Sequence, residues 1–409
     1  MKFNGKVILI SIVLLSAGLA PAQSQPGAAP APGDKPDADA RGRLVRFDFL
    51  GRATRDQVAQ GLAATGWPDV IVKSGVFLAR LVYTTIDAHG SPTIGSGLLA
   101  LPTDMKPIGT VVFEHGTSSQ KQNVPSTPGS GEGQAISALF GSGSFALIAP
   151  DYVGLGLSPG THPYLHASSE ATATLDLLNA AKEAASGWKM QLPNVVYLTG
   201  FSQGGQAVLA TDRLIENDRR ADWRVAALAP ISGPYDLAST EFSGLLTGPS
   251  PTSGAYLGYL TFSYIQVYGT DSEADVFKAP YESEMTSLFD GEHALEQIAL
   301  VLPSPAALFR PAFLNSTLQA KNAFAAELRD NDTTGITPHA PVRLYYGEAD
   351  VDVFPKNTLV AAAAMKSAGV QIDVVDLGPG VDHPASANLG LPAARGWFDA
   401  LAAEEDNKQ

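Results

Sequence analysis

The sequence has 409 residues, a length that fits one large domain with an insertion as well as two or three smaller domains. Its 27 basic and 41 acidic residues give a net charge of −14, which argues against a nucleic-acid partner because phosphate backbones bind clustered positive charge. Hydrophobic residues make up 45% of the chain, enough for a large core, and the lack of cysteine excludes disulfides, thiolate metal sites and a cysteine nucleophile.

The N-terminal residues are typical of an export signal. Two lysines precede an apolar run over residues 7–20, and Ala-Pro-Ala at 20–22 has the small-x-small pattern that signal peptidase cleaves. The run is shorter than the roughly 20 apolar residues that span a bilayer. We therefore expect cleavage after Ala22, no stable membrane anchor, and a periplasmic or secreted bacterial protein.

Residues 23–40 follow as a stretch of Pro, Ala, Gly and Asp with almost no large apolar residue. Such a composition cannot bury enough surface to offset the entropy of ordering it. We expect a flexible linker over 23–40 and a folded domain over 41–409.

From residue 79 onward, apolar strand-like runs alternate with helix-like segments. Two strands joined by a turn at 89–92 are expected to form an antiparallel edge, at 79–86 and 94–101. Further strands are expected at 109–114, 145–150, 194–198, 225–231, 342–346 and 372–377, with helices at 168–185, 205–217, 356–367 and 385–403. This alternation predicts an α/β fold, a doubly wound and mostly parallel sheet with helices on both faces.

About a hundred residues, near 238–338, interrupt the alternation of strands and helices. They include an aromatic-rich stretch at 256–268 and helical patterns around Ala294 and Leu318. Loops of this length rarely lack structure of their own. We expect an inserted helical cap over the carboxyl edge of the sheet, which either covers a site or only supports the core.

Two G-x-S-x-G strings occur, one at Ser158 and one at Ser202. A nucleophile elbow needs a strand before the serine, a helix after it, and a backbone N–H on the next residue to stabilise an oxyanion. Pro159 has no N–H and blocks helix entry, so Ser158 is interpreted as a loop serine. Ser202 meets all three conditions. It is the predicted nucleophile, and Gln203 is a predicted oxyanion-hole donor.

A serine hydroxyl needs a base and an orienting carboxylate. His383, in a Gly/Pro-rich loop after the last strand, is the predicted base, and His293 and His339 are the other histidines that follow Ser202. His293 belongs to the inserted segment, and His339 precedes the last strand pair.

The orienting acid is expected just after the strand at 342–346. Asp350 is the first aspartate there and is the predicted acid, with Asp352 as a close competitor and Asp236 as a more distant one.

A second oxyanion-hole donor is expected in the loop after the strand at 109–114. His115, Gly116 and Thr117 stand there, and the N–H of Thr117 is the candidate. His115 is interpreted as a structural hydrogen-bonding residue beneath the loop.

Together these motifs resemble the α/β-hydrolase superfamily, and within it the bacterial and fungal secretory lipase-like serine esterases. The resemblance covers residues 79–401 and rests on G-F-S-Q-G-G at 200–205, H-G-T at 115–117, D-Y-V-G-L-G at 151–156, H-P-Y-L at 162–165, P-V at 341–342, and the endings at Gly347/Asp350 and Asp382/His383. The single glycine after His115 does not support similarity to the triple-glycine esterases. The resemblance implies a Ser-His-Asp hydrolase that cleaves small-molecule or lipid esters through an acyl-enzyme, without a cofactor.

Three alternatives stay open from the sequence: an acyltransferase, a peptidase using the same triad, and a non-catalytic binding protein of the same fold. Oligomeric state is also open. Residues 330–335 resemble the start of a calcium loop, but its closing position falls on Pro341 instead of a glutamate, so no metal is expected.

Overall fold

The computed structural model describes residues 41–187, 190–218 and 222–406. The predicted signal sequence and linker lie outside the described residues. Within the described ranges, no helix combines the length and the apolar character needed to cross a membrane.

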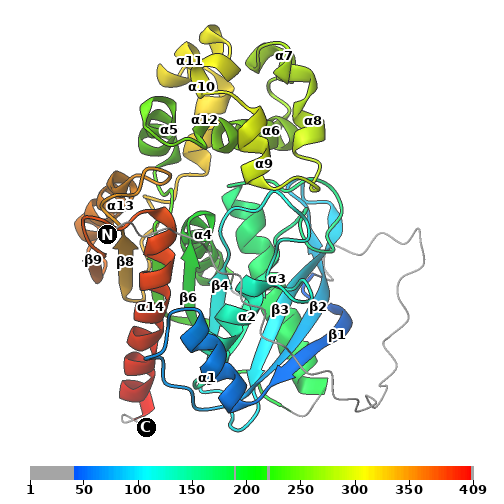
Figure 1. The fold of residues 1–409 in the computed structure, drawn as a ribbon, viewed down its shortest axis with the longest axis vertical. Coiled ribbons are helices and arrows are strands. Elements are labelled where there is room, and N and C mark those ends of the chain that lie inside the picture. The colour runs from blue at the N-terminus through cyan, green and yellow to red at the C-terminus, as the bar shows by residue number, and fades with distance from the viewer. Residues whose placement is uncertain (1–40, 188–189, 219–221, 407–409) are drawn as a thin grey trace.

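A nine-stranded sheet forms the body of the protein (Figure 1). Its strands are Leu44–Ala53 (β1), Val76–Ile86 (β2), Pro92–Pro102 (β3), Gly109–Glu114 (β4), Phe145–Pro150 (β5), Val195–Phe201 (β6), Arg224–Ile231 (β7), Val342–Tyr346 (β8) and Ile372–Asp376 (β9). The spatial order is β1-β2-β3-β5-β4-β6-β7-β8-β9. Pairing is antiparallel from β1 to β5 along this order and parallel from β5 to β9. The predicted mostly parallel sheet with an antiparallel edge is confirmed.

Helices cover both faces of this sheet (Figure 1). One face packs against Ala167–Gly187 (α3), Gln203–Asn217 (α4) and Pro355–Ser367 (α13). The other packs against Arg55–Ala64 (α1), Gly131–Ile136 (α2) with the π-helical turn Ser137–Gly141 (η2), and His383–Asp406 (α14).

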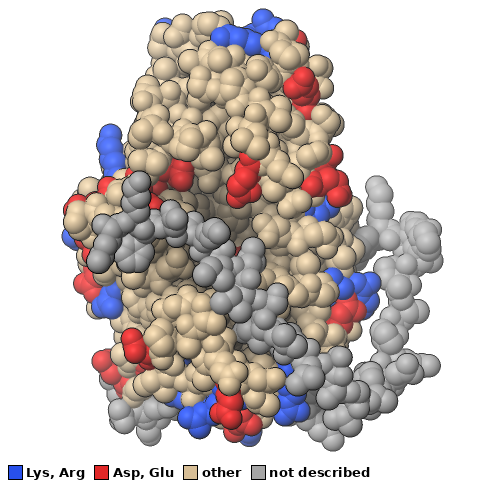
Figure 2. All heavy atoms as spheres, viewed as in Figure 1, with Lys and Arg blue, Asp and Glu red and all other residues tan. Residues whose placement is uncertain are grey.

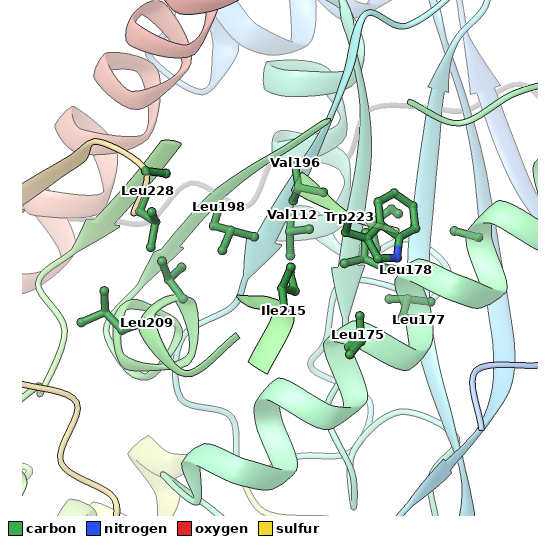
Figure 3. Close-up of a cluster of buried hydrophobic side chains, with 14 of the residues drawn as sticks. Val112, Leu175, Leu177, Leu178, Val196, Leu198, Leu209, Ile215, Trp223 and Leu228 are labelled. Carbon is green, nitrogen blue, oxygen red and sulfur yellow. The ribbon is translucent and has the colours of Figure 1, made fainter. Parts of the chain in front are cut away.

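Successive residues of the central strands face opposite cores, because side chains alternate along a strand. In β4, Val112 belongs to the core beneath α3 and α4, while Val111 and Phe113 belong to the core beneath α14. Figure 3 shows the first core, where Val112 lies near side chains from the helices, such as Leu175. Full burial of one such side chain contributes about 1.5–3 kcal/mol.

The segment between β7 and β8 forms a helical cap at the carboxyl end of the parallel strands (Figure 1). Its helical elements are Leu237–Glu241 (η3), Phe242–Thr247 (α5), Ser253–Tyr268 (α6), Glu273–Val276 (α7), Tyr281–Ser283 (η4), Met285–Leu288 (α8), Leu295–Val301 (α9), Pro305–Leu308 (α10), Pro311–Leu318 (α11) and Ala323–Asp330 (α12). The cap has its own apolar core, which Tyr164 and Leu165 of the body join. In the space-filling view the cap stands above the body, and most residues on the visible face of the molecule are uncharged (Figure 2).

Two elements before residue 79, β1 and α1, were not predicted from the sequence. Thr54 caps α1 with its side chain, which accepts a hydrogen bond from the N–H of Gln57, while the Gln57 side chain accepts one from the N–H of Thr54. This reciprocal pair is a capping box, and T-x-x-Q is its sequence signature. That signature could have predicted the start of α1.

Candidate active site

Ser202 lies at the sharp turn between β6 and α4. Its backbone angles, φ 58° and ψ −122°, are outside the regions that L-residues favour. The turn is held by the Ser202 N–H, which donates to the Ile231 carbonyl (3.0 Å), and by the Gly205 N–H, which donates to the Ser202 carbonyl (2.8 Å). A Cβ on Gly204 would collide with the backbone of Glu114, so the close approach of α4 to β4 requires glycine there. This local structure has the form of a nucleophile elbow.

His383, at the start of α14, lies between Ser202 and Asp350. Its Nε2 is 2.9 Å from the Ser202 hydroxyl oxygen, and its Nδ1 is 2.6 Å from Asp350 Oδ2. All three residues are buried, and the Phe201 ring packs against the imidazole with centroids 4.5 Å apart. A proton on Nδ1, donated to Asp350, leaves the Nε2 lone pair directed at the hydroxyl of Ser202. The structure thus brings the three predicted residues into one hydrogen-bonded chain.

The two aspartates that follow β8 have different partners. Asp350 Oδ1 accepts the N–H of Asp352 (3.0 Å), which leaves Oδ2 for His383. Asp352 Oδ1 instead accepts the hydroxyls of Ser250 (2.5 Å) and Thr252 (3.1 Å), both in the cap. Asp352 therefore joins the body to the cap, and Asp350 contacts the histidine.

The remaining aspartate and histidine candidates have side-chain partners of their own, whereas Ser158 is held through its backbone. Ser158 lies in a loop where its N–H donates to the Leu155 carbonyl (3.0 Å). The side chains of the other candidates contact different residues: Asp236 contacts Thr240 (2.6 Å), His293 contacts Asp290 (3.0 Å) and His339 contacts Glu216 (2.8 Å).

The two predicted oxyanion-hole donors come from the start of α4 and from the loop that follows β4. Gln203 is the first residue of α4, so its N–H lies outside the internal hydrogen-bond ladder of the helix. Gly116 packs against the elbow, since a Cβ built on it would lie 3.7 Å from the Cβ of Ser202. Thr117 is the next residue, and its hydroxyl lies 2.9 Å from the hydroxyl of Tyr164.

A small cavity of about 20 Å³ lies beside Ser202, between the body and the cap. This volume holds about one or two water molecules. Leu165 of the body and Leu245 and Leu260 of the cap supply apolar walls, while Glu241 lies at a polar wall. Sequence reasoning missed these residues because no motif marks them and they come from segments far apart in the chain.

The Glu241 carboxyl is uncharged at neutral pH. Burial raises its pKa to about 8, and its Oε2 accepts a hydrogen bond from the Asn357 side chain (2.6 Å). The wall of the cavity at Glu241 is therefore polar without carrying a charge.

The calcium-like segment at 330–335 has a structural role in this fold. The Asp332 carboxylate accepts the N–H of Ala238 (3.1 Å) at the start of the cap. Among the described residues, no group of three or more His, Asp or Glu side chains is placed to hold a metal ion.

No protein-family model and no curated protein sequence matches the chain. Solved structures do. A presumed hydrolase from Legionella pneumophila has a TM-score of 0.83 and 26% identity over 88% of this chain and 98% of its own. The rice cell wall degrading esterase LipA from Xanthomonas oryzae has a TM-score of 0.77 and 28% identity over 90% of this chain and 98% of its own.

Candida antarctica lipase A in its closed state is more distant. It has a TM-score of 0.64 and 14% identity over 89% of this chain and 83% of its own. At 14% identity, that similarity concerns the fold alone. The two bacterial proteins, a presumed hydrolase and an esterase, are similar to this chain in sequence as well as in fold.

Proposed function

We propose that this chain, which has the α/β-hydrolase fold and is similar to solved esterases, hydrolyses carboxylic esters with Ser202 as the nucleophile. One observation carries the proposal: the Ser202 hydroxyl, the His383 imidazole and the Asp350 carboxylate form a buried chain with contacts of 2.9 and 2.6 Å at a strained elbow. The similarity to esterases supports the same reaction.

In the first half of the reaction, the Ser202 oxygen attacks the ester carbonyl carbon while His383 Nε2 takes the hydroxyl proton. The carbonyl oxygen becomes an oxyanion, which the N–H groups of Gln203 and Thr117 stabilise. The C–O bond to the alcohol then breaks, and His383 returns its proton to the leaving alkoxide. An acyl-enzyme on Ser202 remains.

In the second half, water attacks the acyl carbon, and His383 takes a proton from the attacking water. The bond to the Ser202 oxygen breaks, the proton returns to that oxygen, and the carboxylic acid leaves. Throughout, Asp350 accepts the Nδ1–H of His383 and stabilises the imidazolium that forms transiently.

Hydrolysis of p-nitrophenyl esters from acetate to palmitate tests the proposal. We expect Ser202→Ala to lower kcat roughly a thousandfold or more, because the acyl-enzyme cannot form. Ser158→Ala is the matched control, since it changes the serine of the other G-x-S-x-G string, and we expect it to keep its activity. An active Ser202→Ala protein, or a folded wild type that cleaves no ester of the series, would contradict the proposal.

We also propose that the chain is exported and cleaved after Ala22. The support is the basic start, the apolar run at 7–20 and the small residues at 20–22. The mass of the protein recovered from a periplasmic or culture fraction should correspond to a chain that begins at Gln23. Recovery of the full-length chain only from the cytoplasm would contradict export.

A further inference from the structure

The side chain of Gln203 is buried, although the proposed reaction uses only its backbone N–H. Its amide nitrogen donates one hydrogen bond to Nε2 of His162 (2.8 Å) and another to Oε1 of Glu170 (2.6 Å). All three side chains are buried. The side chain is thus held from two directions, which restricts rotation of the residue that carries the N–H.

His162 is the central residue of this arrangement. Its Nδ1–H donates to the carbonyl oxygen of Val153 (2.9 Å), which places the lone pair of Nε2 toward Gln203. Burial lowers the pKa of His162 to about 3, so the ring is neutral. Burial also raises the pKa of Glu170 to about 8, and its carboxyl is uncharged at neutral pH.

On its other side, His162 connects to the loop that carries the second donor. Its ring stacks on Tyr152, with centroids 5.7 Å apart and an interplanar angle of 11°. Tyr152 packs on the ring of His115 at 4.3 Å, and its hydroxyl donates to the His115 carbonyl (3.3 Å). His115 Nδ1 lies 2.6 Å from the carbonyl oxygen of Gly116, the residue before Thr117.

Backbone strain at Tyr152 supports a functional origin for this arrangement. Its φ of 65° lies in the left-handed region, which a bulky residue adopts only when its surroundings hold it there. Such strain concentrates at functional sites. Here the strained backbone places the Tyr152 ring between the rings of His115 and His162.

We propose that His162 is a positioning residue for the oxyanion hole. His162 sets the spacing between the N–H groups of Gln203 and Thr117. It holds the first through a hydrogen bond to the Gln203 side chain and the second through the ring stack of Tyr152 and His115. The inference rests on the proposed function, because it concerns the oxyanion of the same reaction.

The oxyanion exists only in the transition state and the tetrahedral intermediate. Loss of the spacing should therefore lower kcat and leave KM nearly unchanged. His162→Phe keeps a flat ring on Tyr152 but removes the acceptor for Gln203. We expect kcat to fall about tenfold to a hundredfold, less than the loss that follows complete removal of a donor.

A pair of substrates separates positioning from general damage to the fold. An ester and its thionoester, in which sulfur replaces the carbonyl oxygen, differ in the atom that enters the oxyanion hole. An enzyme with a well-formed hole should prefer the ester strongly. We expect His162→Phe to reduce the ratio of kcat/KM for ester over thionoester by about tenfold, because the fit to oxygen is lost.

His166→Phe is the matched control. His166 is a buried histidine in the same segment, but its Nδ1 contacts the Ser169 hydroxyl (3.1 Å) and its ring packs on Tyr268. The same substitution there should leave the ester-to-thionoester ratio at the wild-type value.

A conservative pair at Glu170 gives a second test. Glu170→Gln keeps an oxygen that can accept from Gln203, and the residue it replaces is uncharged at neutral pH. Glu170→Leu removes the acceptor. We expect the ratio to be retained in Glu170→Gln and reduced in Glu170→Leu.

The outcomes are distinguishable from failure of the proposed function. If the wild type cleaves neither substrate, the ester hydrolase proposal fails. If the wild type is active and depends on Ser202, but His162→Phe lowers both rates in the same proportion or changes neither, the role of His162 as a positioning residue is wrong.

Discussion

Ser202 and Ser158 occupy the same G-x-S-x-G pattern, and their local structures separate them. Ser202 follows a buried strand, precedes a helix and contacts His383, whereas Ser158 lies in the long loop between β5 and α3 and is followed by Pro159. The residue after Ser202 has a backbone N–H, whereas Pro159 after Ser158 has none, and only Ser202 stands between a strand and a helix. Both differences can be predicted from the sequence. The sequence alone does not distinguish the acidic partner of His383 as clearly, because Asp350 and Asp352 are only two residues apart.

The structure distinguishes these two aspartates by their contacts, and mutation can test the difference. Asp350→Asn should lower kcat by roughly a thousandfold to ten thousandfold, because the amide favours the wrong tautomer of His383. Asp352→Asn should lower kcat less than about tenfold, since that carboxylate contacts Ser250 and Thr252. Rates with one p-nitrophenyl ester give the comparison. A larger loss in Asp352→Asn would reverse the assignment of the acid.

At the scale of elements, β4, α3 and α4 meet at the buried side chain of Glu114. This last residue of β4 accepts hydrogen bonds from Thr174 of α3 (2.8 Å) and Thr211 of α4 (2.9 Å) through Oε1. Burial raises the pKa of Glu114 to about 7, so the folded protein favours the protonated carboxyl. One polar side chain thereby ties together the elements that carry the elbow and the oxyanion loop.

The raised pKa of Glu114 predicts a pH-dependent stability. Its contribution is fully present below the unfolded pKa of about 4.5 and is lost as the pH rises through about 7, since unfolding then releases a proton. Glu114→Gln keeps an acceptor and cannot ionise. Between pH 5 and pH 8, we expect the Tm of the wild type to fall by roughly 2 °C more than that of the variant.

The exposed Glu404 provides the control for this measurement. Glu404→Gln should follow the wild-type dependence of Tm on pH. Parallel curves for the wild type and Glu114→Gln would show that ionisation of Glu114 makes no difference to stability.

The elements around the elbow could be predicted because each has a strong local signal. β6 begins with an apolar run, α4 has an amphipathic pattern, and glycines flank Ser202. β1 was missed because it is an edge strand with half-exposed residues, so its pattern is weak. The contact of His162 with Gln203 joins positions 41 residues apart, which no local pattern encodes.

At the scale of the whole molecule, the cap closes over the end of the sheet. The site cavity of about 20 Å³ has walls from both parts, and the hydrogen bonds of Asp352 to Ser250 and Thr252 join them there. The sequence predicted a helical insertion, but not which residues line the cavity. Their identity depends on how helices pack over a site formed by distant segments.

Enlarging the cavity from the cap side should change the preferred acyl length. Leu245→Ala and Leu260→Ala each remove part of an apolar wall, so kcat/KM for p-nitrophenyl octanoate relative to acetate should rise about threefold to tenfold. Leu328→Ala is the control, because Leu328 lies in the same cap core but does not line the cavity.

Initial rates with the two esters give the comparison. An unchanged ratio in both wall variants would show that this cavity does not receive the acyl group. An equal rise in Leu328→Ala would show that general loosening of the cap causes the effect.

The central claim is that Ser202 is the nucleophile of a serine hydrolase, and covalent labelling tests it most directly. The protein is treated with a fluorophosphonate, and the modified peptide is located by mass spectrometry. We predict one adduct on Ser202, its loss in Ser202→Ala, and unchanged labelling in Ser158→Ala. Absence of labelling in the folded wild type, or an adduct that persists in Ser202→Ala, would contradict the claim.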